Sequence, residues 1–524
     1  MLDEPTNDLD LDTLDVLEEM LGDYEGTVIL ISHDRDFLDR VVTSVIVPEG
    51  NGRWIEYAGG YSDMLLQRGA DLKREHAKAA AASEEKKEAR AAAPSSTPKR
   101  RLSFNEKHAL ETLPKTIEKL QAEIAKQQRL LDDPDLYRKD RKKFDEASAA
   151  IATAQTELAA AEDRWLELLA AKIAREYGTP CAVIDMDRVE RNIARIQAQC
   201  DAAGVANRPH IKTHKSPMLA QMQVTAGARG VTCQKIGEAE VMADGGIDDI
   251  LISYNLLGEE KMARLGALQA KANMTVAADN AVVIADLPKA AAASGRTLNV
   301  VVECDTGRKR AGVETPAEAI ALARQIAGSK GLKFAGFMLY PTETGWAEAQ
   351  KFYDDALAGV RAHGLDATMV STGGSPNLKN LGKLKGATEH RPGTYIYNDR
   401  MQVAAGVASW DDCALNIYST VVSRAGPERG ILDAGSKTLT SDPGGGLDGF
   451  GLILEHPEAK IARFAEEHGF LDLARSNTRP NVGDVVRIVP NHVCVVVNMM
   501  DEVVMVRGDE IIGTLPVAAR GKLR

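Results

Sequence analysis

Short apolar runs alternate with longer segments of helical periodicity between about residues 176 and 410. Each run spans only a few residues and is mostly aliphatic or β-branched, as buried strands are. The runs are Cys181–Asp185, Pro209–Ile211, Gly230–Thr232, Ile250–Ser253, Met274–Val276, Asn299–Glu303, Phe334–Phe337 and Thr368–Val370. Repetition of strand, helix and strand is typical of a parallel sheet that closes into a barrel. The pattern therefore predicts an α/β fold, a (β/α)8 barrel, over residues 176–410. After Asp411 the helical period fades and β-branched runs with Gly and Pro turns take over, so residues 411–524 are predicted to form a mostly β domain.

Residues 102–170 show another pattern, with apolar side chains at alternating steps of three and four. The second half carries Phe144, Ala147, Ile151, Ala154, Leu158, Ala161, Trp165 and Leu168 in this register, and the first half carries Leu113, Ile117, Leu120, Ile124 and Leu131. Pro134 lies between the halves and marks a turn. The spacing predicts an antiparallel coiled-coil hairpin. Residues 71–101, rich in Ala, Lys, Glu and Arg and then in Pro and Ser, are predicted to be a charged linker.

Composition narrows the functional classes. A chain of 524 residues with 44% hydrophobic residues is expected to form two or three domains. The net charge of -12 gives no overall basic excess for nucleic-acid binding. The six cysteines are scattered without a C-x-x-C pair, which favours free thiols in a reducing compartment. No secretory signal or bilayer-long apolar run is evident, so we expect a cytoplasmic protein without a membrane partner.

Candidate chemistry begins in the segment Arg208–Lys215, which places Lys212 just after a short apolar strand and among other cations. Burial and like charge lower the pKa of a lysine ammonium. A lysine with a lowered pKa can attack an aldehyde, including that of pyridoxal phosphate. The alternative interpretation is a basic surface loop. Because the active sites of barrels gather after the strands, the position of Lys212 favours catalysis.

A second candidate lies far downstream, at His492 and Cys494. Both fall in a β-branched run, and residues two apart on a strand share a face. Imidazole and thiolate at that spacing could bind one divalent cation, Zn or Mn, with positions open for water or substrate. The alternative is an ordinary core histidine and a buried cysteine.

A third candidate is the turn Thr372-Gly373-Gly374-Ser375, which follows the last predicted strand. Glycine lets the backbone approach a ligand closely, so amides and hydroxyls here could hold a phosphate. Glycine turns after strands are common, so this turn supports a phosphate site only in combination with Lys212.

These stretches together resemble the D-threonine aldolase and D-serine dehydratase family of fold-type III pyridoxal-phosphate enzymes, which have an alanine-racemase-like barrel. The resemblance covers about residues 176–524. It rests on Pro209-His210-Ile211-Lys212, Cys233-Gln234-Lys235, Val302-Glu303-Cys304-Asp305 with Arg310, Leu432-Asp433-Ala434-Gly435, Glu467-His468-Gly469 and His492-Val493-Cys494. It implies a pyridoxal 5'-phosphate cofactor, a divalent metal, a small D-amino acid substrate and a homodimer. The expected cofactor contacts are His210, Lys212, Gln234, Tyr254, Arg310, Thr372, Gly373, Gly374, Ser375 and Tyr395.

The resemblance leaves two reactions open. Retro-aldol cleavage of a β-hydroxy D-amino acid gives glycine and an aldehyde, whereas dehydration of D-serine or 3-hydroxy-D-aspartate gives an oxo acid and ammonia. The aldolases of this family pair histidine with aspartate, but this chain has His492 with Cys494, as the zinc-dependent dehydratases do. The aldolases also carry a histidine base in the loop after Tyr340, where this chain offers only Glu343 as a substitute. We expect an aldolase-like lyase, with a dehydratase as the alternative.

Residues 1 to about 170 resemble the C-terminal half of an ABC-type ATPase of the Uup-like ABC-F group, with the ATPase fragment at residues 1–70. Asp3, Glu4 and His33 match its magnesium ligand, its catalytic acid and its phosphate-sensing histidine. The sequence contains no G-x-x-x-x-G-K-[S/T] phosphate loop, so we expect a truncated, vestigial fragment without ATPase activity. The basic cluster at 138–143 would suit nucleic-acid contact in the resembled Uup tail, although a solvated helix face is the default explanation for such a run. An ABC-F-like interaction module is therefore the competing class of function.

Overall fold

The computed structural model describes residues 104–133, 136–508 and 510–524, with scattered residues between 2 and 64. The chain divides into two compact units, Met1–Pro98 and Lys99–Arg524. Within the described residues, no helix is long and apolar enough to cross a membrane.

The first unit has few described elements. They are β1 (Leu2–Asp3), β2 (Leu30–Ile31), α2 (Arg35–Val41), β3 (Ser44–Pro48) and β4 (Trp54–Ala58). β1 pairs with β2 in parallel, and β3 pairs with β4 as a hairpin. Ile29 and Ile31 are 61% and 47% exposed. Of the predicted ATPase residues, Glu4 and His33 lie outside the described residues, as does the linker 71–101.

The second unit contains the predicted barrel. Its strands are β6 (Ala206–Asn207), β7 (Val231–Cys233), β8 (Asp249–Ile252), β9 (Asn273–Ala278), β10 (Leu298–Cys304), β11 (Leu332–Leu339), β12 (Met369–Gly373) and β13 (Glu389–Arg391). In the described range 136–508, these eight strands run parallel in the order β6-β13-β12-β11-β10-β9-β8-β7. A parallel bridge between His210 and Thr232 joins the two ends of the sheet and closes the barrel.

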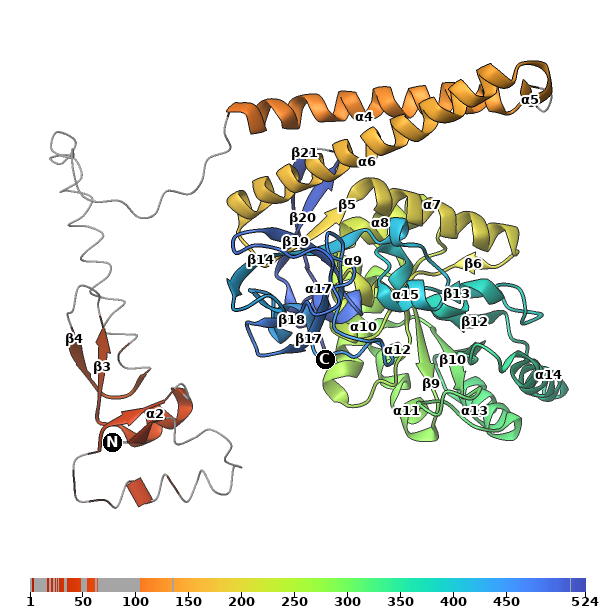
Figure 1. The fold of residues 1–524 in the computed structure, drawn as a ribbon. Coiled ribbons are helices and arrows are strands. Elements are labelled where there is room, and N and C mark those ends of the chain that lie inside the picture. The colour runs from red at the N-terminus through yellow and green to blue at the C-terminus, as the bar shows by residue number, and fades with distance from the viewer. Residues whose placement is uncertain are drawn as a thin grey trace, which may run out of the picture. The chain divides into compact units, whose positions relative to one another are not determined.

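Helices surround the barrel sheet (Figure 1). They are α7 (Met186–Ala202), α8 (Pro217–Thr225), α9 (Ile236–Asp244), α10 (Glu259–Lys271), α11 (Ala281–Asp286), α12 (Pro288–Ser294), α13 (Pro316–Gly328), α14 (Trp346–Ala362) and α15 (Arg400–Ala404). Short 3-10 turns carry several loops: η1 (Ile211–Thr213), η2 (Ser375–Asn380), η3 (Thr394–Ile396) and η4 (Trp410–Asp412).

One predicted barrel strand is wrong. Cys181–Asp185 forms β5, which pairs with β14 and β20 of the second sheet instead of the barrel. The remaining place in the barrel is taken by β13, whose sequence Glu389-His390-Arg391 is charged yet buried. A strand without apolar residues gives no hydrophobic signal, so the sequence pattern could not reveal it.

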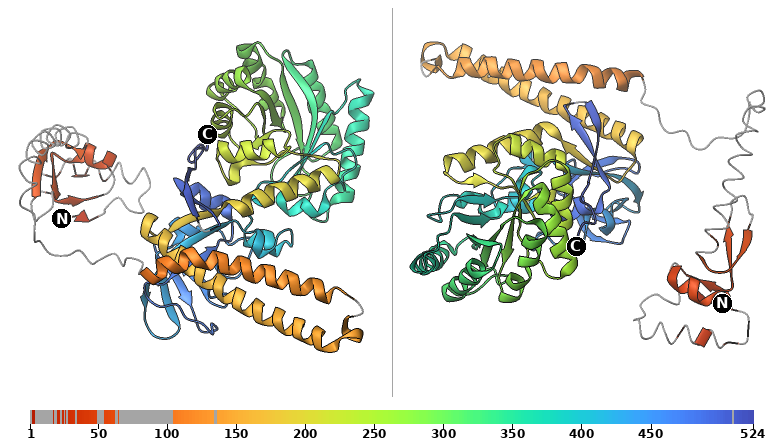
Figure 2. Two further views of the ribbon diagram at one scale, coloured as in Figure 1. Left: turned by 90° about the horizontal axis from the view of Figure 1, so that it is seen from above. Right: turned by 180° about the vertical axis from the view of Figure 1, so that it is seen from behind.

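The predicted β domain is present and is built around a mixed sheet. Its elements are β5 (Cys181–Asp185), β14 (Leu415–Arg424), β15 (Arg429–Leu432), α16 (Ser436–Leu439), β16 (Leu452–Ile453), β17 (Lys460–Phe464), β18 (Gly469–Asp472), β19 (Val485–Val489), α17 (Val493–Met499), β20 (Glu502–Arg507) and β21 (Glu510–Pro516). Because β5 lies between β14 and β20, the chain enters this sheet before the barrel and returns to it afterwards. Figure 2 shows the two domains beside each other.

The coiled-coil prediction is confirmed. α4 (Phe104–Leu131), the short α5 (Leu136–Lys139) and α6 (Arg141–Tyr177) form a hairpin in which α4 and α6 run side by side (Figures 1 and 2). Ala147, Ile151, Ala154 and Ala161 are buried in the seam. At the tip, Arg141 and Lys142 pair with acids one helical turn away, as in an ordinary solvated helix face.

α6 continues beyond the coiled coil and packs against the β domain. Leu169 and Ile173 are buried against Val183, Tyr418 and Val504 on the outer face of the β-domain sheet. The hairpin is therefore anchored through an apolar contact with the second sheet, and it is not simply attached through a linker.

Leu169→Ala tests this anchoring. Removing the buried isobutyl group should lower the free energy of unfolding by about 2–5 kcal/mol. Gln155→Ala, an exposed position on the same helix, should change it by less than about 0.5 kcal/mol. Thermal denaturation followed by tryptophan fluorescence measures both, since Trp165 packs against the same cluster. Equal stability of the two variants would show that the anchoring is unimportant.

Candidate active site

Lys212 lies in the short turn η1, directly after β6. Its neighbours Ile211 and Thr213 are fully buried, so the turn is fixed, while the Lys212 side chain is exposed. The expected burial of Lys212 is therefore wrong; Lys215 is the buried lysine of the segment, 3% exposed. His214 is also buried, and burial lowers its pKa to about 4, so it adds no positive charge at neutral pH.

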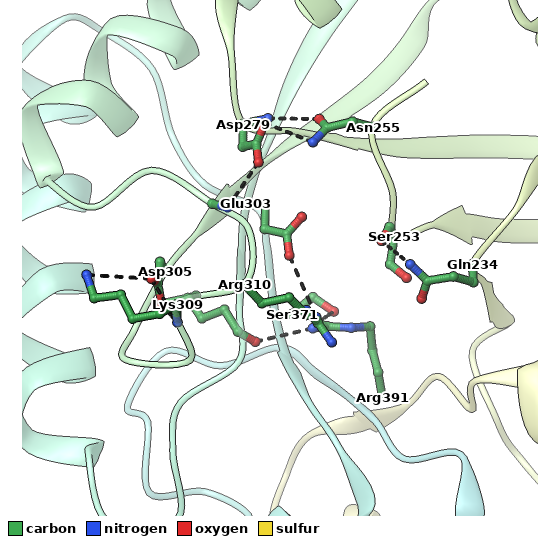
Figure 3. Close-up of polar contacts among 12 residues, drawn as sticks. Gln234, Ser253, Asn255, Asp279, Glu303, Asp305, Lys309, Arg310, Ser371 and Arg391 are labelled. Atoms are coloured by element: carbon green, nitrogen blue, oxygen red, sulfur yellow. Dashed lines mark hydrogen bonds and ion pairs between the residues drawn. The ribbon is translucent and has the colours of Figure 1, made fainter. Parts of the chain in front are cut away.

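His210 lies next to Lys212 and is a neutral imidazole. Its Nε2 is 3.1 Å from Gln234 Oε1, and its Nδ1 faces the Lys212 backbone N–H at 3.4 Å. Burial, reinforced by the charge of Lys212, lowers the pKa of His210 well below its usual value. Gln234 in turn donates to the backbone carbonyl of Ser253 at 3.3 Å (Figure 3). The ends of β6, β7 and β8 are thus linked at the predicted site.

The predicted phosphate loop offers mainly its backbone. The Thr372 hydroxyl lies 2.9 Å from His390 Nδ1, and the Ser375 hydroxyl accepts from the Gly393 N–H at 3.0 Å. Gly374 has a φ of 98°, and a Cβ there would collide with the Tyr340 hydroxyl. A glycine is therefore required where this turn passes under Tyr340, and its approach to a phosphate stays a prediction.

Arg310 projects from the loop after β10. Its guanidinium is 4.0 Å from Glu303, and its carbon lies 5.5 Å from the centre of the Tyr340 ring. Figure 3 shows Arg310, Glu303 and Arg391 turned toward one another. Burial raises the pKa of Glu303, although Arg391 and Arg310 oppose that shift. The Arg310 side chain is 62% exposed, so its guanidinium is accessible to a ligand.

Two of the predicted cofactor contacts are tyrosines in different surroundings. Tyr254 is 43% exposed, with the Lys235 ammonium 3.7 Å from its ring centre, and its role stays a prediction. Tyr395 is fully buried, and its hydroxyl accepts from Gln223 at 2.8 Å. The Tyr395 ring packs in the core that the barrel shares with the β domain, and its contact with the cofactor stays a prediction.

The candidate metal ligands are close together, but not on a strand as predicted. His492 caps the N-terminus of α17, and Cys494 lies in its first turn. The His492 Nδ1 is 2.7 Å from Asp442 Oδ2. Burial would lower the pKa of His492, but the Cys494 thiol and the Asp442 carboxylate outweigh it and raise the pKa to about 9. Burial would raise the pKa of Cys494, but His492, Lys212 and Thr213 together lower it.

This donor set suits a divalent metal. A thiol with a lowered pKa more readily supplies the thiolate that binds zinc. A carboxylate bonded to one imidazole nitrogen directs the other nitrogen to the metal. Two protein ligands, His492 and Cys494, would leave coordination positions open for water or substrate. Among the described residues, no group of three or more His, Cys, Asp or Glu could hold a metal. Asp442 was not foreseen, because it lies fifty residues from His492 in a glycine-rich loop.

The metal pair and the lysine turn form one site. The Cys494 sulfur is 3.0 Å from the Thr213 hydroxyl and 3.7 Å from the Thr394 hydroxyl. Lys212 is near enough for its charge to lower the pKa of Cys494. The turn that carries the exposed Lys212 amine, with His210 beside it, therefore lies against the His492–Cys494 pair, so one site could serve both pyridoxal phosphate and a metal.

Glu343 lies on the loop after β11, beside Arg308, whose guanidinium carbon is 4.3 Å from the centre of the Tyr340 ring. Its carboxylate is 2.8 Å from the Arg308 guanidinium. Burial would raise its pKa, but Arg308 outweighs burial and lowers it. A carboxylate with a lowered pKa is a weak general base, so the catalytic role of Glu343 stays a prediction that this pairing does not favour.

Family models match most of the chain. "Alanine racemase, N-terminal domain" matches residues 184–401, and "Putative serine dehydratase domain" matches residues 414–506. Residues 101–170 match "ABC transporter C-terminal domain". The Uup ATP-binding protein of Caulobacter vibrioides is 43% identical over 172 residues, which are 32% of this chain and 28% of Uup. The first part is thus similar to about a quarter of that relative.

The later part has relatives of nearly full length. D-threonine aldolase of Arthrobacter sp is 33% identical over 359 residues, covering 66% of this chain and 93% of the relative. The structure of D-threonine aldolase from Filomicrobium marinum superposes with a TM-score of 0.62 at 32% identity, covering 66% of this chain and 96% of that one. D-threo-3-hydroxyaspartate dehydratase from Delftia sp. HT23 gives 0.60 at 28% identity, covering 64% and 97%. Two solved variants of D-threo-3-hydroxyaspartate dehydratase replace a histidine and a cysteine two positions apart, and the cysteine variant was solved in its metal-free form.

Asp442→Asn tests the metal site. Asparagine keeps the shape but loses the charge that orients His492, so binding of Zn²⁺ to chelator-treated protein should weaken about 10–100-fold. Asp448→Asn is the control, since Asp448 is an exposed acid nearby that pairs with Lys460. Zinc titration measures both variants. Unchanged affinity in Asp442→Asn would rule out the proposed orientation of His492.

The barrel fold, the matching family model and the relatives indicate the same family. Over its later two thirds the chain belongs to the D-threonine aldolase and D-threo-3-hydroxyaspartate dehydratase family of enzymes, pyridoxal-phosphate- and divalent-metal-dependent lyases with an alanine-racemase-like barrel.

Proposed function

We propose that this chain is a lyase that cleaves β-hydroxy D-amino acids, such as D-threonine, to glycine and an aldehyde. The observation that carries the proposal is the contact between Thr213 and Cys494, which places the Lys212 turn against the metal pair. A substrate with its amino group at Lys212 would have its β-hydroxyl toward His492 and Cys494. The D-threonine aldolase relative supports the aldol outcome and the D configuration.

The residues have separate tasks in this proposal. Lys212 would hold pyridoxal phosphate, with neutral His210 beside it and the backbone at Gly373 and Gly374 toward its phosphate. His492 and Cys494 would hold Zn or Mn. When bound, the cofactor withdraws electrons from the substrate's α carbon and the metal acidifies the β-hydroxyl.

A neutral His210 matters for Lys212. A protonated imidazole there would repel the lysine ammonium and a cationic cofactor ring, whereas a neutral one can accept or donate a hydrogen bond. The half-buried contact with Gln234 at 3.1 Å fixes the imidazole orientation. The residues of the chain thus position the amine and limit positive charge around it.

Dehydration is the second candidate, because His492 and Cys494 have the spacing of a histidine and a cysteine that were replaced in a related dehydratase. The same ligands could activate the β-hydroxyl as a leaving group, and 3-hydroxy-D-aspartate or D-serine would give an oxo acid and ammonia. We also propose a homodimer, which the family resemblance implies. Nucleic-acid binding by the hairpin tip stays a prediction.

The two reactions differ in their products. Purified protein with pyridoxal phosphate and either Zn²⁺ or Mn²⁺ is supplied with D-threonine, D-serine and 3-hydroxy-D-aspartate. An aldolase releases glycine and an aldehyde, and a dehydratase releases ammonia and an oxo acid; we expect glycine from D-threonine as the main product. Lys212→Ala should reduce turnover at least about 10³-fold and remove the visible absorption band of the bound cofactor.

Lys351→Ala is the matched control, because Lys351 is an exposed lysine on α14 that pairs with Asp355 one turn away. It should retain wild-type turnover. Absence of any product from all three amino acids, or an active Lys212→Ala variant, would contradict the proposal.

A further inference from the structure

Lys215 has an unusual backbone and side-chain environment for a lysine. It follows the turn that carries Lys212 and has a φ of 53°, a left-handed conformation that is costly for a residue with a Cβ. Its N–H donates to the Ile211 carbonyl at 2.7 Å, and its own carbonyl accepts from the Ala519 N–H at 3.0 Å. Its side chain is 4% exposed. A strained, buried lysine persists only where its surroundings hold it.

The ammonium of Lys215 is bound by two residues from different elements. Asn498 Oδ1 on α17 accepts from it at 2.7 Å, and Glu238 Oε1 on α9 lies 3.4 Å away. Glu238 also accepts from the backbone N–H groups of Gln234 at 2.7 Å and Lys235 at 3.3 Å. The ammonium therefore joins the Lys212 turn, the loop after β7 and the helix of the β domain.

The bond to Asn498 reaches the metal site along α17. Asn498 lies four residues after Cys494, so both side chains project from the same face of the helix. The opposite face carries Val493, Val496 and Val497, which are buried in the core of the β domain. Thr213 contacts Cys494, and Lys215 contacts Asn498 one turn further on. Two parallel contacts thus connect the lysine turn to the metal-binding helix and fix both its distance and its rotation.

We propose that Lys215 is a positioning residue, which through Asn498 sets α17, and with it His492 and Cys494, at the distance and angle from Lys212 that the reaction requires. This inference rests on the proposed lyase function for its role in catalysis. The two contacts between the Lys212 turn and α17 do not depend on which reaction is catalysed. It assigns to the second lysine of the segment a task distinct from that of Lys212.

Asn498→Leu is the sharpest test. It removes the bond across the domains but leaves the Lys215–Glu238 pair in the barrel intact. Zn²⁺ affinity of the chelator-treated protein should fall about 10-fold or more. Pyridoxal phosphate should still give its absorption band, because the barrel side of the site is unchanged. Asn498→Asp keeps an acceptor for the ammonium and should restore zinc affinity to within about threefold of wild type.

Asn477→Leu, the same substitution at an exposed position of the β domain, is the control and should bind zinc as wild type does. A double variant, Lys215→Met with Asn498→Leu, should bind zinc no more weakly than Lys215→Met alone, because both changes remove one interaction. Wild-type zinc affinity in Asn498→Leu would overturn the proposal. So would an equal loss of zinc binding, cofactor binding and melting temperature, which indicates a merely structural role.

The zinc and cofactor titrations separate this inference from the proposed function. If the wild type turns over no β-hydroxy amino acid but Asn498→Leu still loses zinc, the proposed function fails and the positioning role stands. If the wild type is an active lyase and Asn498→Leu binds zinc normally, the positioning role fails and the function stands.

Discussion

The contact of the Cys494 sulfur with the Thr213 hydroxyl, 3.0 Å apart, is the interaction on which the rest of this structure depends. The two residues belong to different domains and lie 281 positions apart. A lysine turn without a metal pair would be an ordinary barrel loop, and a metal pair without the lysine would be an isolated two-ligand site. Their contact gives one site in which the Lys212 turn could bind the amino group of a small molecule while the metal pair binds its neighbouring hydroxyl.

The fold maintains this contact by interleaving its two domains. β5 enters the second sheet before the barrel begins, and β14 to β21 return to that sheet after the barrel ends. The C-terminal segment comes back to the barrel, where the Ala519 N–H donates to the Lys215 carbonyl. α6 covers the outer face of the same sheet with Leu169 and Ile173. Because these connections are buried, the β domain is held against the barrel, and the coiled-coil hairpin shares in its stability.

The sequence predicts the parts of this structure that leave a periodic or local signal. Alternating apolar runs indicate the barrel, heptad spacing indicates the hairpin, and position after a strand indicates Lys212. The sequence pattern does not reveal β13, because its three residues are polar and have no hydrophobic signal. Inside the barrel, Glu389 binds Arg208, His390 contacts Thr372 and Arg391 donates to Ser371. α17 was expected to be a strand because β-branched residues favour strands, yet packing of its valines against the core outweighs that preference.

Side-chain partners distant in the sequence were the least predictable. Nothing local indicates that Asp442 binds His492, that Tyr395 turns into the core, or that Lys215 rather than Lys212 is the buried cation. Each depends on the tertiary fold.

Phosphorus NMR of the bound cofactor tests the central claim most directly. If Lys212 and the metal pair share one site, paramagnetic Mn²⁺ should broaden the resonance of the pyridoxal 5'-phosphate group, whereas diamagnetic Zn²⁺ should leave it sharp. A cofactor resonance that stays sharp with Mn²⁺ bound would contradict the account, because the metal and the cofactor would then occupy separate sites.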